Sequence, residues 1–203
     1  KNNAKFENVG QWKRAWYYQK KDEDMYAAVQ RESKAARENA GILDASTLGK
    51  IDIQGTDASE FLNRVYTNAW SKLAIGKCRY GLMLNEDGMV YDDGVTTRLD
   101  ENHYIMTTTT GGASTVMGKL EDFLQTEWPE LKVYLTSATD HFATVSVCGP
   151  HSKKILEKVT KNIDYSDKIF PHMSYKEGLI DKIKCRVMRI SFTGELSYEI
   201  NIQ

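Results

Sequence analysis

Two adjacent carboxylates, Asp92 and Asp93, have the setting best suited to chemistry, because they interrupt an apolar, strand-like segment. Side chains alternate between the two faces of a strand, so the pair must point to opposite faces. One carboxylate therefore faces the core or a cavity, where it loses solvation and needs a partner. Either it is a positioned acid, base or hydrogen-bonding group for a ligand nitrogen, or nearby backbone N–H groups satisfy it while the other carboxylate is exposed.

A third carboxylate, Glu199, lies between Tyr198 and Ile200 in a strand-like segment that follows the turn 192–195. A buried carboxylate can accept two N–H donors from a planar heterocycle, which gives specific recognition. The alternative is an ordinary exposed glutamate on a strand.

A run of four threonines, residues 107–110, leads into Gly111 and Gly112. The hydroxyls can line a polar pocket, since glycine lets a ligand approach the backbone closely. The run also fits the end of a β-rich strand and its turn, and both interpretations stay open. It lacks the Gly-Lys-Ser/Thr ending of a P-loop, and the chain contains no Gly-x-Gly-x-x-Gly dinucleotide motif.

Neither a metal site nor a disulfide framework is indicated. The cysteines, Cys78, Cys148 and Cys185, are odd in number and far apart in the sequence. We therefore expect buried thiols in a reducing, cytoplasmic compartment. The histidines show no metal-ligand spacing, so no metal is predicted.

The bulk properties describe an ordinary globular protein. With 203 residues, of which 41% are hydrophobic, the chain can bury a core of one or two domains. A net charge of −1 gives no basic field for nucleic acid or an anionic membrane. No apolar stretch approaches the roughly 18–20 residues that span a bilayer. The chain starts at Lys1 and stops within strand-like sequence at Gln203, so we expect a piece of a longer protein.

Hydrophobic periodicity predicts an α+β fold. Helices are expected over 22–40 (ended by Gly41), 58–65, 113–126 and 152–159. Strands are expected over 48–53, 78–84, 89–99, 104–109, 132–136, 143–147, 179–190 and 196–202. The Asp87-Gly88 turn predicts a hairpin, so the sheets should be antiparallel. Residues 1–20, rich in Trp and Tyr, are expected to form an irregular arm that packs its aromatic rings onto another surface.

Several stretches together resemble the glycine-cleavage T-protein, or aminomethyltransferase, superfamily. The order and spacing of the motifs agree with that family over nearly the whole chain from about residue 22. The motifs are Ala40-Gly-Ile-Leu-Asp-Ala-Ser46, Gly76-Lys-Cys-Arg-Tyr80, Met83-Leu-Asn-Glu-Asp-Gly88 with the pair Asp92-Asp93, Val147-Cys-Gly-Pro150, and Phe192-Thr-Gly-Glu195 with Tyr198-Glu-Ile200.

Within that superfamily the chain resembles the alpha-subunit family of heterotetrameric sarcosine oxidases. The features that carry this resemblance are Ser46-Thr-Leu-Gly-Lys50, Thr107–Gly112, Gln125-Thr-Glu-Trp-Pro129 and Gly10-Gln-Trp12. The resemblance implies a T-protein-like folate-binding domain over 22–203, truncated before a C-terminal barrel and preceded by an aromatic arm over 1–21. It also implies an enzyme with beta, gamma and delta subunits as partners, a flavin in the beta subunit, and NAD in another part of the alpha subunit.

The same resemblance implies an activity and a set of site residues. Oxidised sarcosine would give its one-carbon unit to tetrahydrofolate, which yields 5,10-methylenetetrahydrofolate. Asp93 matches the catalytic aspartate, which acts on the N10 region of the folate, and Glu199 matches the glutamate that takes the N–H edge of the pterin. The resemblance therefore implies that Asp93 and Glu199 face one hollow that fits a flat, nitrogen-rich ring. Leu48, Tyr80, Thr107 and Phe192 match positions that line the folate. Leu48 replaces the family's usual Met and Phe192 its usual Tyr, so a hydroxyl contact is absent there.

Two other functions remain open from the sequence. One is a free-standing aminomethyltransferase or the folate domain of a dimethylglycine dehydrogenase-like enzyme, and a flavin subunit encoded beside this gene would argue against it. The other is a module with the same fold that binds partners and has lost its chemistry. The presence of both Asp93 and Glu199 argues against that second alternative.

Overall fold

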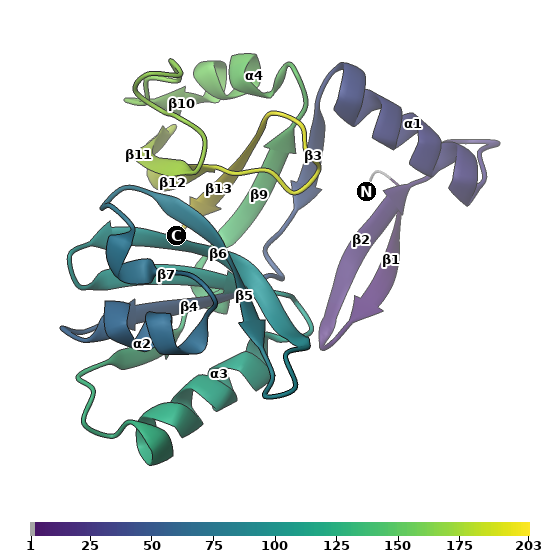
Figure 1. The fold of residues 1–203 in the computed structure, drawn as a ribbon. Helices are drawn as coiled ribbons and strands as arrows, with labels where there is room; N and C mark the ends of the chain where they lie inside the picture. Colours follow the sequence, from purple (N-terminus) through teal and green to yellow (C-terminus); the bar gives the residue numbers. More distant parts are fainter. Residues whose placement is uncertain (1–2) are drawn as a thin grey trace. The chain divides into compact units, whose positions relative to one another are not determined.

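The computed structural model describes residues 3–203, which separate into two compact units. Unit 1 comprises residues 3–47, 142–172 and 176–203. Unit 2 comprises residues 48–141 and 173–175. Each unit contains a β-sheet with its own hydrophobic cluster (Figure 1).

Unit 2 is built on a sheet with the strand order β5-β6-β7-β4-β8 (Figure 1). Its strands are β4 (Gly49–Gln54), β5 (Cys78–Leu84), β6 (Val90–Asp100), β7 (His103–Thr108) and β8 (Tyr134–Ser137). Its helices are α2 (Ala58–Val65) and α3 (Ala113–Asp122), with 3-10 turns at Trp70–Lys72 and Thr139–His141 and a π-helical turn at Phe123–Glu127. All four strand pairs are antiparallel, as the hairpin signal predicted.

The core of unit 2 covers one face of this sheet. Ile51 and Ile53 of β4 and Met106 of β7 cluster with Phe61 and Leu62 of α2, and all five side chains are at most 2% exposed. Burying a side chain of this size contributes about 1.5–3 kcal/mol, so these contacts hold α2 on the sheet. Thr107 of β7, a predicted site residue, has the opposite parity to Met106 and must project from the other face.

Unit 1 contains a larger sheet with the strand order β10-β11-β12-β13-β9-β3 and a separate hairpin, β1-β2. Its strands are β1 (Ala4–Val9), β2 (Trp12–Tyr18), β3 (Gly41–Asp44), β9 (Ala143–Cys148), β10 (Thr160–Lys161), β11 (Ser174–Ile180), β12 (Ile183–Arg189) and β13 (Ser197–Ile202). The first two residues of β11 belong to unit 2 and the rest of the strand belongs to unit 1. Its helices are α1 (Met25–Glu38) and α4 (Ser152–Val159). Leu156 of α4 packs with Val147, Tyr198 and Ile200 of the sheet.

The first helix is shorter than predicted at both ends. It starts after Asp24, whose carboxylate accepts a hydrogen bond of 2.8 Å from the Ala27 N–H and so caps the first turn. Asn39, not the predicted Gly41, caps its C-terminus. Gly41 instead begins β3, a strand that the sequence did not predict, and a Cβ there would lie 3.3 Å from the Ala36 Cβ and the Cys148 Sγ.

The prediction of an irregular N-terminal arm was wrong for the part of the chain that the structure describes. Residues 4–18 form the regular hairpin β1-β2, with Gly10 at φ 59° in its turn. The register shifts between Lys5 and Phe6, and this bulge breaks the alternation that would have marked a strand. Residues 1–2 lie outside the described residues, and the predicted division between residues 21 and 22 stays a prediction.

The predicted strand over 179–190 was also wrong, because this segment contains a hairpin turn. β11 ends at Ile180 and β12 begins at Ile183. Asp181 in the turn has φ 54°, a left-handed conformation that aspartate tolerates better than most residues. The helix predicted over 113–126 ends as an α-helix at Asp122 and continues as the π-helical turn.

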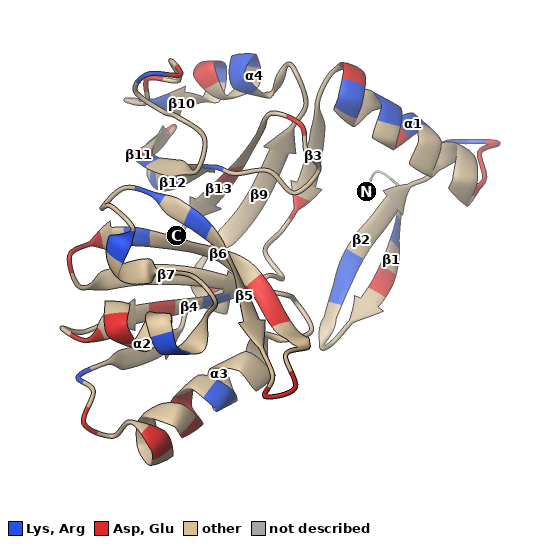
Figure 2. Cartoon of the chain, viewed as in Figure 1, with Lys and Arg blue, Asp and Glu red and all other residues tan. Residues whose placement is uncertain are grey.

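The two helices of unit 1 carry mixed charge. Figure 2 shows Lys and Arg interspersed with Asp and Glu on α1 and on α4. This agrees with a net charge of −1 and with the absence of a single-sign field along these helices. Over residues 3–203, no helix combines the length and the apolar character needed to cross a membrane.

Candidate functional site

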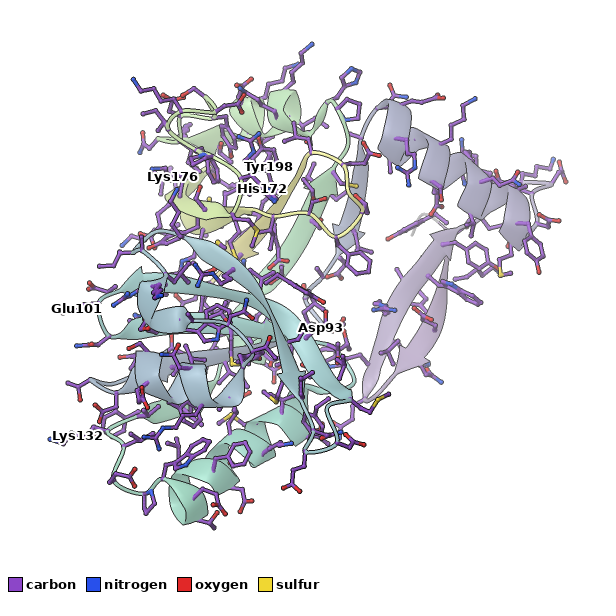
Figure 3. All side chains as sticks on the ribbon, viewed as in Figure 1. Asp93, Glu101, Lys132, His172, Lys176 and Tyr198 are labelled. Carbon is purple, nitrogen blue, oxygen red and sulfur yellow. The ribbon has the colours of Figure 1, made fainter. Side chains whose placement is uncertain are left out.

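Asp92 and Asp93 lie in the middle of β6 and point to opposite faces, as strand alternation predicted. Asp92 is 4% exposed, whereas Asp93 is half-buried. Their Cα partners on β5 are Met83, which belongs to the core cluster, and Leu82. Asp92 therefore lies on the core face of the sheet, and Asp93, which is labelled in Figure 3, projects from the other face.

Asp93 is paired with a phenol. The Tyr80 hydroxyl on β5 donates a hydrogen bond of 2.6 Å to Asp93 Oδ2. This hydrogen bond, with a smaller contribution from burial, raises the pKa of Tyr80, so the phenol stays protonated and remains the donor. Asp93 keeps Oδ1 and the remaining lone pairs of Oδ2 for other donors. A half-buried carboxylate oriented in this way can accept a proton from, or a hydrogen bond from, an amine N–H of a ligand.

Asp92 is satisfied within the protein. Thr109 donates to it twice, from its hydroxyl to Oδ1 at 2.6 Å and from its backbone N–H to Oδ2 at 3.3 Å. Burial raises the pKa of Asp92, and the two hydrogen bonds from Thr109 oppose this shift. The inward-facing carboxylate is thus satisfied within the protein, by one backbone N–H as one interpretation expected and by a side-chain hydroxyl that it did not include.

The threonine run mainly serves the protein's own hydrogen bonds. Thr107 is buried, and its hydroxyl accepts from the Val95 N–H at 2.9 Å. The Thr108 hydroxyl donates to the Thr109 carbonyl, and the Thr109 hydroxyl donates to Asp92. Thr107 lies on the same sheet face as Tyr80, because its Cα partner Lys50 alternates with the core residue Ile51. The predicted contact of Thr107 with a ligand stays a prediction.

Tyr66, which follows α2, lies near Asp92 and Asp93 although it was not among the predicted site residues. It is 5% exposed and bridges to Met83, the cross-strand partner of Asp92. Burial, with the negative charges of Asp92 and Asp93 as further causes, raises the pKa of Tyr66 strongly. A neutral phenol is therefore held beside the two carboxylates. No local motif marks this tyrosine, since its position depends on how α2 packs against β5.

Glu199 lies on β13 in unit 1 and is 8% exposed, so the alternative of an exposed strand glutamate was wrong. Its Cα partners are Ser146 on β9 and Met188 on β12. Asn201, two residues along the same face, donates to Glu199 Oε1 at 3.5 Å and accepts from the Thr144 hydroxyl at 2.7 Å. The core residues Tyr198 and Ile200 point to the opposite face, so this row of polar groups is separate from the core of unit 1.

The other two predicted site residues flank strands. Phe192 is 98% exposed in the turn before β13, where Gly194 has φ 84°. The Ser191 hydroxyl closes this turn by donating to the Glu195 carbonyl at 2.7 Å, so the exposed ring stands on an ordered loop. Leu48 precedes β4 and is half-buried, and its carbonyl accepts from the buried Lys50 ammonium at 2.9 Å.

The structure therefore brings Tyr80, Asp93 and Thr107 onto one face of the sheet in unit 2. Glu199 and Phe192 belong to unit 1. The predicted hollow shared by Asp93 and Glu199 stays a prediction. Within residues 3–203, no group of three or more His, Cys, Asp or Glu side chains is placed to hold a metal ion, and the three cysteines are buried and not joined in a disulfide.

Comparison with known proteins gives three findings of similarity. Residues 1–203 match the family described as the GCVT N-terminal domain. The chain is 56% identical over 200 residues to sarcosine oxidase subunit alpha of Corynebacterium sp. (strain P-1), and 47% identical over 205 residues to sarcosine oxidase subunit alpha of Rhizobium meliloti (strain 1021). These matches cover 98% and 100% of this chain but 21% of each relative, so the chain spans about a fifth of their length.

A solved structure has the same fold. The glycine cleavage system aminomethyltransferase T from Bartonella henselae superposes with a TM-score of 0.81 at 24% identity. The superposition covers 98% of this chain and 50% of that chain. It confirms the predicted α+β, T-protein-like fold and shows that this chain corresponds to part of the larger one.

Proposed function

Because the chain belongs to the family of GCVT N-terminal domains, we propose that it is the folate-binding part of a sarcosine oxidase alpha subunit. In this role it transfers the one-carbon unit of oxidised sarcosine to tetrahydrofolate, which gives 5,10-methylenetetrahydrofolate. The identity of 47–56% to sarcosine oxidase alpha subunits over essentially the whole chain supports this choice. The single observation that carries the chemistry is the pairing of Tyr80 with Asp93.

The residues on the accessible face of unit 2 fit an amine-bearing ligand. When bound, tetrahydrofolate supplies amine nitrogens that take up a carbon at the oxidation level of formaldehyde. Asp93 accepts the proton that leaves a nitrogen in the N10 region as the new C–N bond forms, and the glycine nitrogen of oxidised sarcosine takes up a proton as its bond to the transferred carbon breaks. Tyr80 holds Asp93 Oδ2 through the 2.6 Å hydrogen bond, so the carboxylate presents Oδ1 to the ligand in a fixed orientation.

We assign the remaining predicted contacts residue by residue. Glu199 is a buried strand carboxylate that accepts N–H donors, and we propose that it takes the N–H edge of the pterin. Phe192 offers an aromatic face that no neighbouring side chain covers, and we propose that it packs against a ring of the folate. Leu48 and Thr107 complete the proposed set as an apolar and a hydroxyl contact.

The other parts of the proposed enzyme lie outside this chain. Sarcosine would be oxidised at a flavin in a beta subunit, NAD would bind elsewhere in the alpha subunit, and gamma and delta subunits would complete the complex. The relatives named as alpha subunits, which are about five times as long as this chain, support such a division of labour. Within the chain we propose an aromatic arm over 1–21 and a folate-binding domain over 22–203.

Calorimetry with tetrahydrofolate tests the proposal. The complete protein should bind one folate per alpha subunit, and Glu199→Gln should weaken binding by about 10- to 100-fold, since a hydrogen bond to a charged group contributes about 1.5–3 kcal/mol. Glu177→Gln on β11 is the matched control, because Glu177 is exposed, and it should leave the affinity unchanged. Failure of the wild-type protein to bind, or equal affinities of wild type and Glu199→Gln, would show that the folate assignment is wrong.

A further inference from the structure

A chain of three hydrogen bonds ties Asp92 to the start of α3. The Gly112 N–H donates to the Thr109 hydroxyl oxygen at 3.1 Å. That hydroxyl donates to Asp92 Oδ1 at 2.6 Å, and the Thr109 N–H donates to Asp92 Oδ2. Both carboxylate oxygens of a nearly fully buried side chain are thus held by a single residue of the segment between β7 and α3.

The direction of each hydrogen bond in this chain is fixed by chemistry. A backbone N–H can only donate, so the Thr109 oxygen must be the acceptor from Gly112. The single hydroxyl proton is then committed to Asp92, whose carboxylate accepts it. A hydroxyl that donates to a carboxylate at 2.6 Å makes one of the stronger hydrogen bonds found in proteins.

The packing around Asp92 leaves no room for a side chain at position 112. A Cβ added at Gly112 would lie 2.7 Å from both Asp92 Oδ1 and the Thr109 Oγ1. Gly112 is the N-cap residue of α3, whose positive end favours a negative charge. The absence of a side chain at position 112 is therefore what lets the Asp92 carboxylate reach Thr109 and the first turn of the helix.

The hydrogen bonds from Thr109 to Asp92 lie beyond the point where the backbone pairing between β6 and β7 stops. Within residues 3–203, the paired residues of that ladder on β6 run from Thr96 to Asp100. At Val95 the N–H bonds to the Thr107 hydroxyl instead of a backbone carbonyl. At the position of the two carboxylates, the connection from β6 toward the end of β7 is made by the side chain of Asp92.

We propose that Asp92 and Thr109 are positioning residues for Asp93. Asp92 and Asp93 share one peptide bond, so anchoring Asp92 on the core face fixes the β6 backbone from which Asp93 projects on the other face. Tyr80 then completes the orientation of Asp93 from the side of β5. This inference rests on the proposed role of Asp93 in the one-carbon transfer.

Thr109→Val and Thr109→Ser test this inference in the complete protein. Valine keeps the shape of threonine and the backbone N–H but removes the hydroxyl, whereas serine keeps the hydroxyl. Transfer of the carbon to tetrahydrofolate should slow by about tenfold in Thr109→Val, as expected for loss of one strong positioning contact. Thr109→Ser should stay within about twofold of wild type, and sarcosine oxidation should be unchanged in both variants.

A double-mutant cycle separates positioning from general damage to the fold. If Thr109 acts through Asp93, Thr109→Val should have no further effect on transfer in an Asp93→Ala background. Additive effects, equal rates for Thr109→Val and Thr109→Ser, or a wild-type rate for Thr109→Val would each overturn the inference. If Asp93→Ala alone leaves transfer unchanged, the proposed function fails instead.

Crystal structures of the two variants give a readout that does not depend on the chemistry. The distance from Tyr80 Oη to Asp93 Oδ2, 2.6 Å here, should exceed hydrogen-bonding range in Thr109→Val and be preserved in Thr109→Ser. An unchanged distance in Thr109→Val would overturn the inference whatever the transfer rates are.

Discussion

Gly94 provides a test of how the two carboxylates are placed, because it directly follows Asp93 on β6 and its Cα lies close to the backbone of β7. A Cβ at position 94 would lie 1.9 Å from the Thr107 carbonyl oxygen, whereas ordinary contacts begin at 3.4 Å. Gly94→Ala therefore forces the strands apart by about 1.5 Å. The atom in the way is backbone, so no side-chain rotation can relieve the contact.

The expected cost follows from this geometry. Overpacking costs about 1–3 kcal/mol, and the upper end applies because two strands must move. A chain of this size loses about 2–4 °C in melting temperature per kcal/mol, so Gly94→Ala should melt about 6–12 °C below wild type. The displaced strand would also stretch the hydrogen bonds from Thr109 to Asp92, so transfer to folate should fall as well.

Gly118→Ala is the matched control for this measurement. Gly118 lies within α3, and a Cβ there meets no atom within 4 Å. Alanine is the better helix former by about 1 kcal/mol, so this variant should be slightly more stable than wild type. Thermal and urea unfolding of both variants give the comparison. A melting temperature for Gly94→Ala equal to or above that of wild type would refute the reasoning about close strand approach.

Three further predictions concern single side chains. Asp24→Ala should destabilise the chain by about 1 kcal/mol in urea unfolding, since it removes the cap of α1; an unchanged midpoint would contradict the cap. Burial raises the pKa of the Asp92 carboxyl above its ordinary value of 3.8, so folding favours the protonated form of this group. The free energy that Asp92 contributes to folding is therefore fully present below pH 3.8 and is lost as the pH rises through the raised pKa. The stability of wild type relative to Asp92→Asn should therefore fall with rising pH, by at most about 1.4 kcal/mol per pH unit, and a pH-independent difference would exclude the shift. Tyr80→Phe removes the donor to Asp93 and should lower the rate of carbon transfer about tenfold with little change in stability, because Tyr80 is 50% exposed; unaltered transfer would rule out its orienting role.

Local patterns in the sequence were sufficient for most of the elements and for part of the site. The Asp-Gly turn predicted the β5-β6 hairpin, and the period of two predicted that Asp92 and Asp93 point to opposite faces. Both inferences depend only on residues close together in the chain. The missed hairpins had no such signal, since β1-β2 contains a bulge and the turn between β11 and β12 is marked only by Asp181.

The partners of the site residues depend on tertiary structure, which explains why they were not predicted. Thr109 is 17 residues from Asp92, and it reaches that carboxylate only because the segment between β7 and α3 folds back over β6. The sequence left open whether the threonine run lines a ligand pocket or ends a strand; in the structure the hydroxyls of Thr107 and Thr108 bond to backbone and that of Thr109 bonds to Asp92. Tyr66 lies beside the carboxylates because α2 packs on the sheet, a contact without a local sequence pattern.

In the proposed function, Asp93 serves carbon transfer and not the oxidation of the amine. Sarcosine labelled with ¹³C in its methyl group, supplied to the complete enzyme with tetrahydrofolate, tests this claim directly by NMR. Wild type should place the label in 5,10-methylenetetrahydrofolate, whereas Asp93→Ala should consume sarcosine at a similar rate and release most of the label as formaldehyde. Asp87→Asn, an exposed change in the turn of the same hairpin, should behave as wild type. Equal yields of labelled methylenetetrahydrofolate from wild type and Asp93→Ala, with folate bound in both, would contradict the account.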